Sequence, residues 1–308
     1  MSGPFPNRTR GDWITRARDE LIHARIETGT WSYRAGGTDS VEPSVLGALA
    51  LRGLGTELSE GDQSHNERLA SWLVSIQNKD GSIGLSGAQR SPGWPTSYAL
   101  LLWHELKRAE GCRRSAVRWL LGQKGRTIRP EFNLDRTIGH DTMLVGWPWV
   151  TDTHSWLEPT ALAVLALRKE GAGNNTRVLE GLKLIRDRAI PGGGWNYGNK
   201  AAFGTALRPQ PAPTGLALLA LADSEGERTQ IVSEAIRYLR AILPKTRSPF
   251  ALGWGLLGLA AWNDRPTEAN TWLAESFDQV TGRSDAPIRL ALLLLAAGSH
   301  SIATFRDN

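Results

Sequence analysis

The 308-residue sequence is poor in the residue types that build cross-links, membrane spans and metal clusters. Cys112 is the single cysteine, which excludes an intramolecular disulfide and a cysteine-based metal cluster. We therefore expect no metal site and no cofactor. The longest apolar stretch, around Leu290 to Ala297, is shorter than the roughly 18 residues that a transmembrane helix needs. The N-terminal MSGPFPNRTRG lacks the apolar core of a secretory signal. These absences favour a cytoplasmic location.

Charge is present but is not gathered on one partner-specific surface. The net charge is +5 and the pI is about 9.6, yet the basic residues are scattered along the chain. The sequence thus lacks the basic stripe with interleaved aromatic residues that is typical of nucleic-acid binding, and we predict no nucleic-acid partner. A mildly basic surface favours anionic lipid or phosphate, which leaves peripheral membrane contact open.

What the sequence does contain is a repeated pair of helical patterns. A proline followed by a run rich in Ala, Leu and Gly occurs six times, and proline suits the first turn of a helix because its missing N–H would be unpaired there. These runs begin at Pro43, Pro95, Pro159, Pro213, Pro249 and Pro287. They are apolar on nearly every side, which predicts helices that are buried all round.

Segments with a single apolar stripe alternate with these runs. They are WITRARDELIHARI, NERLASWLVSIQ, SAVRWLLGQ, NTRVLEGLKLIRDR, TQIVSEAIRYLRAIL and TEANTWLAESFDQV. Six surface helices around six buried ones predict an all-α fold, an (α/α)6 toroid, with a linear solenoid of helix pairs as the alternative. We predict a flexible N-terminus over residues 1–11, a single toroid domain over 12–299 and a C-terminal tail over 300–308.

Tryptophan is the one abundant aromatic residue, with 13 copies against 6 Phe and 4 Tyr. Several tryptophans neighbour glycine, proline or a loop, whereas ordinary core filling would use more Leu and Phe. We therefore predict an aromatic wall that binds substrate. Its candidate members are Trp31, Trp94, Trp147, Trp149, Trp156, Trp195 and Tyr197.

The segment WPWVTDTHSWLEPT, residues 147–160, places acids, a histidine and tryptophans directly before a buried run. If all six inner helices start at the same end, this segment and the other long connections gather over a common mouth. We predict Glu158 as a general acid or base with His154 as its hydrogen-bond partner, and Asp152 or Asp141 as a second carboxylate. The alternative is that Glu158 only caps its helix, a role worth about 1 kcal/mol. Glu42 stands in the same place before Pro43, which supports that alternative.

A second motif carries a family resemblance. A predicted outer helix that contains Trp72 is followed by Gln77 and then by the pair Asp80-Gly81. This arrangement resembles the QW-type repeat of squalene-hopene cyclases and related terpene cyclases. A partial copy occurs at Trp119, and a copy without the glutamine occurs at Trp195. The likeness covers roughly residues 13–298, over which the chain resembles the prenyltransferase and squalene-cyclase toroid superfamily.

This resemblance implies an apolar, isoprenoid ligand in an axial cavity and, if the chain is catalytic, acid- or base-assisted cyclisation or isomerisation. The cyclases' acidic motif Asp-x-Asp-Asp-Thr-Ala falls on residues 156–161, with Glu158 at the proton-donating position. Trp156 and Pro159 replace the flanking acids. The zinc ligands of the prenyltransferase branch have their nearest match at Asp152-Thr153-His154, which lacks the cysteine. Because these relatives use a second domain or subunit, the resemblance leaves open whether this chain binds a second subunit.

Two other functions fit the same fold, and the sequence leaves open whether the chain is an enzyme. A carbohydrate-active hydrolase or lyase would show an open groove with two acids facing each other across it. A non-catalytic toroid that binds a protein or peptide partner would have an axis filled by its own side chains. The residues expected to fill it are Leu51, Leu101, Leu165 and Leu219.

Overall fold

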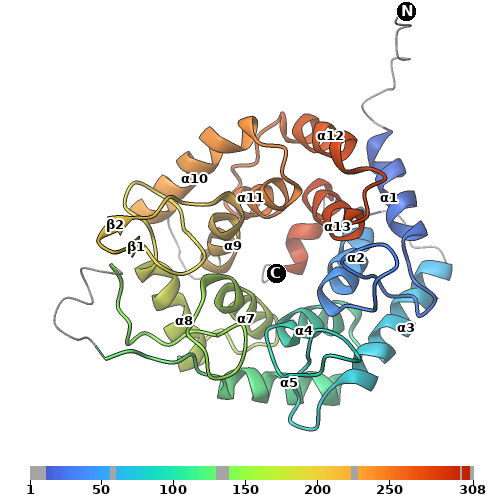
Figure 1. Cartoon of the computed structure of the whole chain (residues 1–308), viewed down its shortest axis with the longest axis horizontal. Helices are drawn as coiled ribbons and strands as arrows, with labels where there is room; N and C mark the ends of the chain where they lie inside the picture. The colour runs from blue at the N-terminus through green and yellow to red at the C-terminus, as the bar shows by residue number, and fades with distance from the viewer. Residues whose placement is uncertain (1–11, 56–59, 130–138, 223–227, 299, 306–308) are drawn as a thin grey trace, which may run out of the picture.

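The computed structural model describes residues 12–55, 60–129, 139–222, 228–298 and 300–305. Its helices alternate between an outer and an inner layer around one central axis (Figure 1). The outer helices are α1 (Trp13–His23), α3 (Glu60–Ile76), α5 (Glu110–Gly122), α8 (Thr176–Asp187), α10 (Gln230–Ile242) and α12 (Ala269–Val280). The inner helices are α2 (Val41–Gly53), α4 (Pro95–Leu106), α7 (Leu157–Lys169), α9 (Pro211–Leu221), α11 (Pro249–Ala261) and α13 (Ala286–Ala297). Two 3-10 turns, η1 (Leu243–Lys245) and η2 (Ser301–Thr304), and a short hairpin of β1 (Ala201–Ala202) and β2 (Thr205–Ala206) complete the described elements.

The inner helices form a closed ring. Each packs against the next along the chain, and α13 packs against α2, so the last inner helix meets the first (Figure 1). A linear solenoid would leave these two helices apart. The predicted all-α toroid is therefore confirmed, with outer and inner helices in the predicted order.

Residue size explains how closely two inner helices approach. Helices α9 and α11 cross at Gly215 and Gly258, where a Cβ atom on Gly215 would lie 2.1 Å from the Trp254 carbonyl oxygen. A Cβ atom on Gly258 would lie 2.6 Å from the Gly215 Cα atom. Only glycine allows this backbone contact, which accounts for the glycines within these apolar runs.

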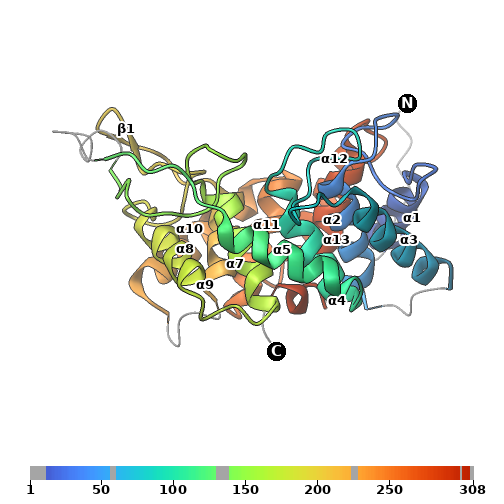
Figure 2. The same ribbon diagram turned by 90° about the horizontal axis from the view of Figure 1, so that it is seen from below.

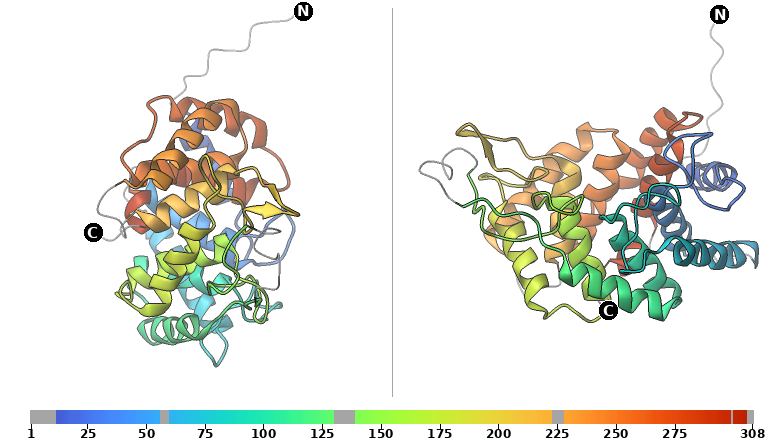
Figure 3. Two further views of the ribbon diagram at one scale, coloured as in Figure 1. Left: turned by 90° about the vertical axis from the view of Figure 1, so that its left-hand side faces the viewer. Right: turned by 60° about the horizontal axis from the view of Figure 1, so that its bottom comes forward.

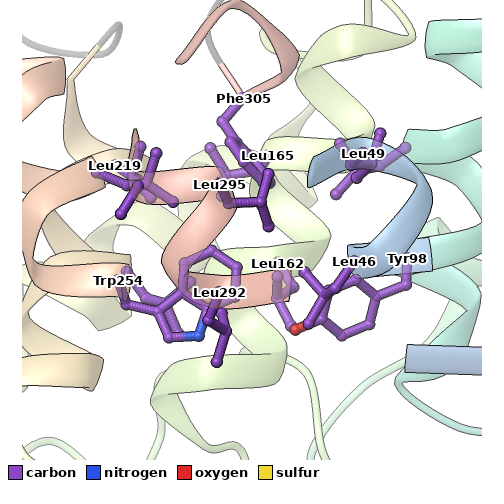
Figure 4. Close-up of a cluster of buried hydrophobic side chains, with 14 of the residues drawn as sticks. Leu46, Leu49, Tyr98, Leu162, Leu165, Leu219, Trp254, Leu292, Leu295 and Phe305 are labelled. Atoms are coloured by element: carbon purple, nitrogen blue, oxygen red, sulfur yellow. The ribbon is translucent and has the colours of Figure 1, made fainter. Parts of the chain in front are cut away.

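The axis of the ring is filled by the protein's own side chains. Every inner helix contributes to one central cluster, which contains Leu46, Leu49, Tyr98, Leu162, Leu165, Leu219, Trp254, Leu292, Leu295 and Phe305 (Figure 4). The leucines of this cluster are all 0% exposed, so no water-sized space adjoins them. The four leucines proposed from the sequence to fill the axis, Leu51, Leu101, Leu165 and Leu219, are likewise at most 5% exposed. Within the described residues, the part of the axis that the central cluster occupies therefore leaves no tube for a ligand.

The end of the ring opposite the long connections is covered by the C-terminal segment. Figure 2 shows the red C-terminal turn η2 on one side of the ring and the long connections on the other, and the tilted view in Figure 3 agrees. The Phe305 ring stacks edge-on against Trp254 with centroids 5.8 Å apart, and Lys169 Nζ donates to the Ala303 carbonyl at 2.9 Å. Any ligand site on the axis therefore has to be reached from the other end.

Four of the long connections are fixed by the same hydrogen bond. Directly after the proline near the start of each of four inner helices stands a hydroxyl residue, Ser44, Thr96, Thr160 or Thr214. Each hydroxyl accepts a backbone N–H from the preceding connection at 2.9 to 3.0 Å, and the donors are Trp31, Ile83, Trp147 and Trp195, respectively. We call this contact the hydroxyl clasp. It ties each connection to the helix that follows.

The glutamine of the QW-like motif also has a structural role. The Gln77 side-chain amide donates to the carbonyl oxygens of Gly81, at 2.9 Å, and Cys112, at 3.0 Å. It thereby joins the turn after one outer helix to the start of the next.

None of the described helices combines the length and apolar character that crossing a membrane requires.

Loss of a hydroxyl clasp should destabilise the fold. We expect Thr160→Val to lower the free energy of unfolding by about 1–3 kcal/mol, because it leaves the buried Trp147 N–H without a partner. Chemical denaturation followed by tryptophan fluorescence measures this change. The matched control is Thr205→Val on the exposed hairpin, which should have little effect. Equal stabilities of the two variants would contradict a structural role for the clasp.

Candidate active site at the mouth of the ring

The four long connections cover residues 24–40, 77–94, 123–129 with 139–156, and 188–210 of the described chain. They lie over the N-terminal ends of α2, α4, α7 and α9 (Figure 2). Successive connections are joined by backbone hydrogen bonds, from Val41 N–H to the Leu85 carbonyl and from Trp94 N–H to the Trp149 carbonyl. The third such bond, from Leu157 N–H to the Tyr197 carbonyl, measures 2.8 Å. We call the surface enclosed by these connections the mouth.

Two glutamates lie at the mouth on neighbouring parts of the inner ring. Glu42 and Glu158 are each the second residue of their helices, α2 and α7, and α4 stands between these helices in the ring. Both side chains are partly buried. The N-cap residue of α7 is Trp156, so Glu158 lies inside the first turn and is not the cap residue of the alternative interpretation.

Two tyrosines bind one of these glutamates but not the other. The Tyr33 hydroxyl donates to Glu42 Oε2 at 2.5 Å, and the Tyr98 hydroxyl donates to Glu42 Oε1 at 3.3 Å. Tyr98 comes from α4 and is fully buried, whereas Tyr33 belongs to the connection before α2 and is 36% exposed. The phenol groups therefore favour a negative charge on Glu42.

The two carboxyl groups influence each other electrostatically. Burial, and then the charge of Glu42, raise the pKa of Glu158 to about 8. Burial also raises the pKa of Glu42, although its hydrogen bonds from Tyr33 and Tyr98 act in the opposite direction. Two carboxyl groups that repel each other hold one proton between them near neutral pH. Because the tyrosine hydrogen bonds stabilise the Glu42 carboxylate while the pKa of Glu158 is raised to about 8, the pair favours the proton on Glu158 and the negative charge on Glu42.

The other acidic and histidine candidates lie elsewhere in the connection before α7. His154 is exposed, with Nδ1 3.4 Å from the Arg126 carbonyl oxygen. Asp152 is exposed in a turn with a φ of 65°, and an Asp141 side-chain oxygen accepts the Met143 N–H at 2.8 Å. The charge that acts on Glu158 is that of Glu42 rather than that of any of these three residues.

Three of the predicted aromatic wall residues lie inside the fold. Trp31, Trp147 and Trp195 are at most 2% exposed. Each indole Nε1 donates to a carbonyl oxygen of the preceding outer helix, at Leu21, Leu120 and Ile185, respectively. They anchor the connections to the outer layer and do not face a ligand at the mouth.

The remaining aromatic candidates reach the surface of the mouth. Trp156 is 36% exposed and Tyr197 is 46% exposed. Trp94 and Trp149 stack edge-on with centroids 5.1 Å apart, and Trp94 also contacts Tyr98 at 5.6 Å. Trp94 and Trp149 line a groove of about 480 Å³, together with apolar residues that include Leu85 and Val150. The groove is therefore connected to the acid pair through Tyr98.

The sequence pattern predicts Glu158 as a site residue, but it does not predict Glu42 or the two tyrosines that bind Glu42. Glu42 was assigned to a helix cap, and Tyr33 and Tyr98 were not considered. The available signal was the repeated Glu-Pro at 42–43 and 158–159, which places two identical acids in the same turn of two inner helices. Within the described residues, no group of three or more His, Cys, Asp and Glu side chains is arranged to hold a metal ion.

Comparison with known proteins supports the fold without selecting an activity. No family model matches the sequence, and no curated protein matches it. The type II terpene cyclase MstE from Scytonema, in complex with geranylgeranyl dihydroxybenzoate, superposes with a TM-score of 0.64 at 12% identity, covering 96% of this chain and 98% of the cyclase. An inactive variant of an α-1,6-mannanase from Salegentibacter in complex with α-1,6-mannotriose gives a TM-score of 0.60 at 14% identity, covering 96% of this chain and 100% of the mannanase.

An α-amylase from Clostridium perfringens is similar to the same degree, with a TM-score of 0.60 at 12% identity and coverage of 95% of this chain and 98% of the amylase. The chain thus shares its toroid fold with a terpene cyclase and with glycoside hydrolases. At such identities the likeness concerns the fold alone, so function has to be argued from the site.

The raised pKa of Glu158 predicts a specific pH dependence of stability. The folded state holds this proton up to about pH 8, whereas the unfolded chain releases it near 4.5. Stability contributed by the neutral acid is therefore present at low pH and lost as pH rises through this window. We expect the Tm of the wild type to fall by a few degrees relative to Glu158→Gln between about pH 5 and pH 9. Differential scanning calorimetry of both proteins tests this, and a Tm difference that stays constant with pH would contradict a shifted Glu158.

Proposed function

We propose that this toroid is an acid–base enzyme whose catalytic pair is Glu158 and Glu42, and that it hydrolyses a glycosidic bond at the mouth. The observation that carries the proposal is the unequal environment of the two acids: Glu42 accepts two phenol hydrogen bonds, whereas burial and the charge of Glu42 raise the pKa of Glu158. Glycoside hydrolysis needs one protonated and one ionised carboxyl group near the scissile bond.

The roles of the two residues follow from their protonation. Glu158 donates its proton to the glycosidic oxygen as the bond from that oxygen to the anomeric carbon breaks. Glu42, as the carboxylate, stabilises the positive charge that develops on the sugar and accepts a proton from the water that adds to the anomeric carbon. Transfer of that proton from Glu42 to Glu158 through solvent restores the neutral acid and the carboxylate. The exposed rings of Trp156, Tyr33 and Tyr197 offer surfaces against which a sugar ring stacks.

The filled axis weighs against the isoprenoid cavity expected from the family resemblance. A folded isoprenoid chain needs an apolar cavity, whereas the leucines of the central cluster are 0% exposed. An acid whose pKa is near 8 is also a weak proton donor for an alkene, although it suits an oxygen leaving group. A filled axis also fits a non-catalytic toroid that binds a protein or peptide, but that function gives no reason for an unequal pair of buried acids.

One observation keeps isoprenoid chemistry as a second candidate. The groove of about 480 Å³ beside Trp94 and Trp149 has a mostly apolar lining, with Gln89, Arg90 and Ser91 as its polar members, and does not include the residues of the central cluster. A short isoprenoid held there would contact the residues that connect to Tyr98 and the acid pair. Incubation with short polyprenyl substrates, followed by mass analysis of the products, distinguishes this candidate from glycan hydrolysis.

Substitution of either acid should abolish hydrolysis. We expect Glu158→Gln and Glu42→Gln each to lower kcat by about 10²–10⁴-fold, because each removes one proton-transfer group. Release of reducing sugars from a panel of neutral and acidic oligosaccharides measures the activity. Glu67→Gln on outer helix α3 is the matched control, since its side chain is 63% exposed, and it should retain full activity. If no oligosaccharide is cleaved, or if Glu158→Gln cleaves at the wild-type rate, the proposal is wrong.

The hydrogen bond from Tyr33 should set the acidic limb of the pH–rate profile. Tyr33→Phe removes a donor that favours the Glu42 carboxylate, so the pKa of Glu42 rises further. We expect the acidic limb of kcat/KM to move upward by about 0.5–1 pH unit. Tyr33 is partly exposed, so the fold should tolerate the change. An acidic limb that does not move would show that Glu42 is not the ionised partner.

A further inference from the structure

A pocket of about 280 Å³ lies at the mouth beside Trp156, and its lining is rich in basic and amide side chains. The polar residues that matter here are Arg126, His140, His154, Arg188 and Asn199. Among the described residues, the lining contains no aspartate or glutamate, which contrasts with the acid pair. Two guanidinium groups without a lining carboxylate make the pocket attractive to an anion.

Arg188 is the buried cation of this pocket. Its side chain is 6% exposed and donates to the Gly198 carbonyl oxygen at 2.8 Å, while Arg188 Nε finds no hydrogen-bond partner in the part of the chain that the structure describes. Its nearest acid, Asp187, lies 3.8 Å from Nε and is also 3.8 Å from Lys200 Nζ. Burial lowers the pKa of Arg188 to about 10, although Asp187 and Asp141 act in the opposite direction. The carboxylates present therefore do not fully compensate the burial of this charge.

The second guanidinium is held at the opening of the pocket. The Arg126 backbone N–H donates to the Thr153 carbonyl at 2.8 Å, which pairs this residue with the segment that carries His154. The Arg126 side chain is exposed, as are those of His154 and Asn199. An anion that enters the pocket thus meets an exposed arginine first and a buried arginine deeper in the same space.

Trp156 connects the pocket to the helix that carries Glu158, because it is the N-cap residue of α7. Trp156 lines the pocket and stands two residues before Glu158, and a Cβ atom on Gly198 would lie 2.9 Å from the Trp156 ring. The same segment supplies Tyr197, whose carbonyl oxygen accepts the Leu157 N–H. Arg188 binds the Gly198 carbonyl and so fixes this segment. A substrate that spans Trp156 therefore reaches both the basic pocket and Glu158.

We propose that this pocket binds an anionic group of the substrate, a carboxylate or a phosphate, and positions the neighbouring neutral part of the molecule at Glu158 and Glu42. Together with the proposed hydrolysis, on which this second step rests, the pocket makes the substrate an acidic saccharide: a uronic acid or a sugar phosphate. The binding step itself depends only on the pocket.

Isothermal titration calorimetry of the full chain with D-glucuronate, D-glucose 6-phosphate, inorganic phosphate and D-glucose tests the binding step. We expect binding of at least one of the three anions and a Kd for D-glucose at least about tenfold weaker. Arg126→Gln should weaken anion binding by about tenfold, and Arg188→Gln by more, because these substitutions remove the charges that contact the anion. Arg208→Gln is the matched control, since Arg208 is an exposed arginine of a neighbouring connection and does not line the pocket. It should bind the anion as the wild type does.

Arg188 also holds the Gly198 carbonyl, so Arg188→Gln could lose binding by misfolding, and Arg126→Gln is the variant that separates the two effects. Arg126 is exposed, so Arg126→Gln should keep the wild-type Tm, and its loss of binding then reports on the pocket itself. If no anion binds, or if Arg126→Gln and Arg208→Gln weaken binding equally, the anion site is wrong. Glucuronate binding without phosphate binding assigns the carboxylate as the ligand, and the reverse assigns the phosphate. Anion binding without hydrolysis of any glycan overturns the proposed function alone, whereas cleavage of neutral glycans without anion binding overturns this inference alone.

Discussion

The structure depends on the packing of six apolar helices against one another around a shared axis. Each inner helix gives side chains to the central cluster, and the last helix closes on the first, so the ring buries its apolar surface without a ligand (Figure 4). Phe305 covers the end opposite the long connections. The axis is thereby closed at that end, and the other end is the mouth, where the first turns of the inner helices meet the connections. Both proposed sites lie there for this reason.

The electrostatic properties of the acid pair follow from the way in which the inner helices begin side by side at the mouth. A carboxylate in the first turn of a helix is normally stabilised by the helix dipole, which lowers its pKa. At the mouth, burial and the second carboxylate outweigh the dipole, and the pKa of Glu158 moves in the opposite direction. The two phenol donors then divide the pair into a carboxylate and an acid. No residue of the pair is unusual alone; the chemistry arises from three neighbouring inner helices presenting their starts to one another.

The helical periodicity was enough to predict the ring, because one apolar stripe or a fully apolar surface is a local property of each segment. The partner of Glu158 was not predictable in the same way, since Glu42 becomes its neighbour only through ring order. The tryptophans illustrate a different limit. Trp147 and Trp156 stand in the same connection, yet one is 2% exposed and the other 36%. The buried tryptophans of the long connections are those held by a clasp, because three of the four clasps fix Trp31, Trp147 and Trp195 by their backbones.

The mouth is built on one side of a nearly symmetric ring, and the clasp explains the asymmetry. The four helices with a clasp, α2, α4, α7 and α9, are neighbours and follow the long connections. At the equivalent positions of α11 and α13 stand Phe250 and Ile288, which have no hydroxyl, and the connections before these two helices are short. Long connections without a clasp would lose a buried hydrogen bond, and clasps without long connections would have no partner. Both features therefore occur together on the side that carries the acid pair and the basic pocket, while α11 and α13 contribute to the packing of the ring.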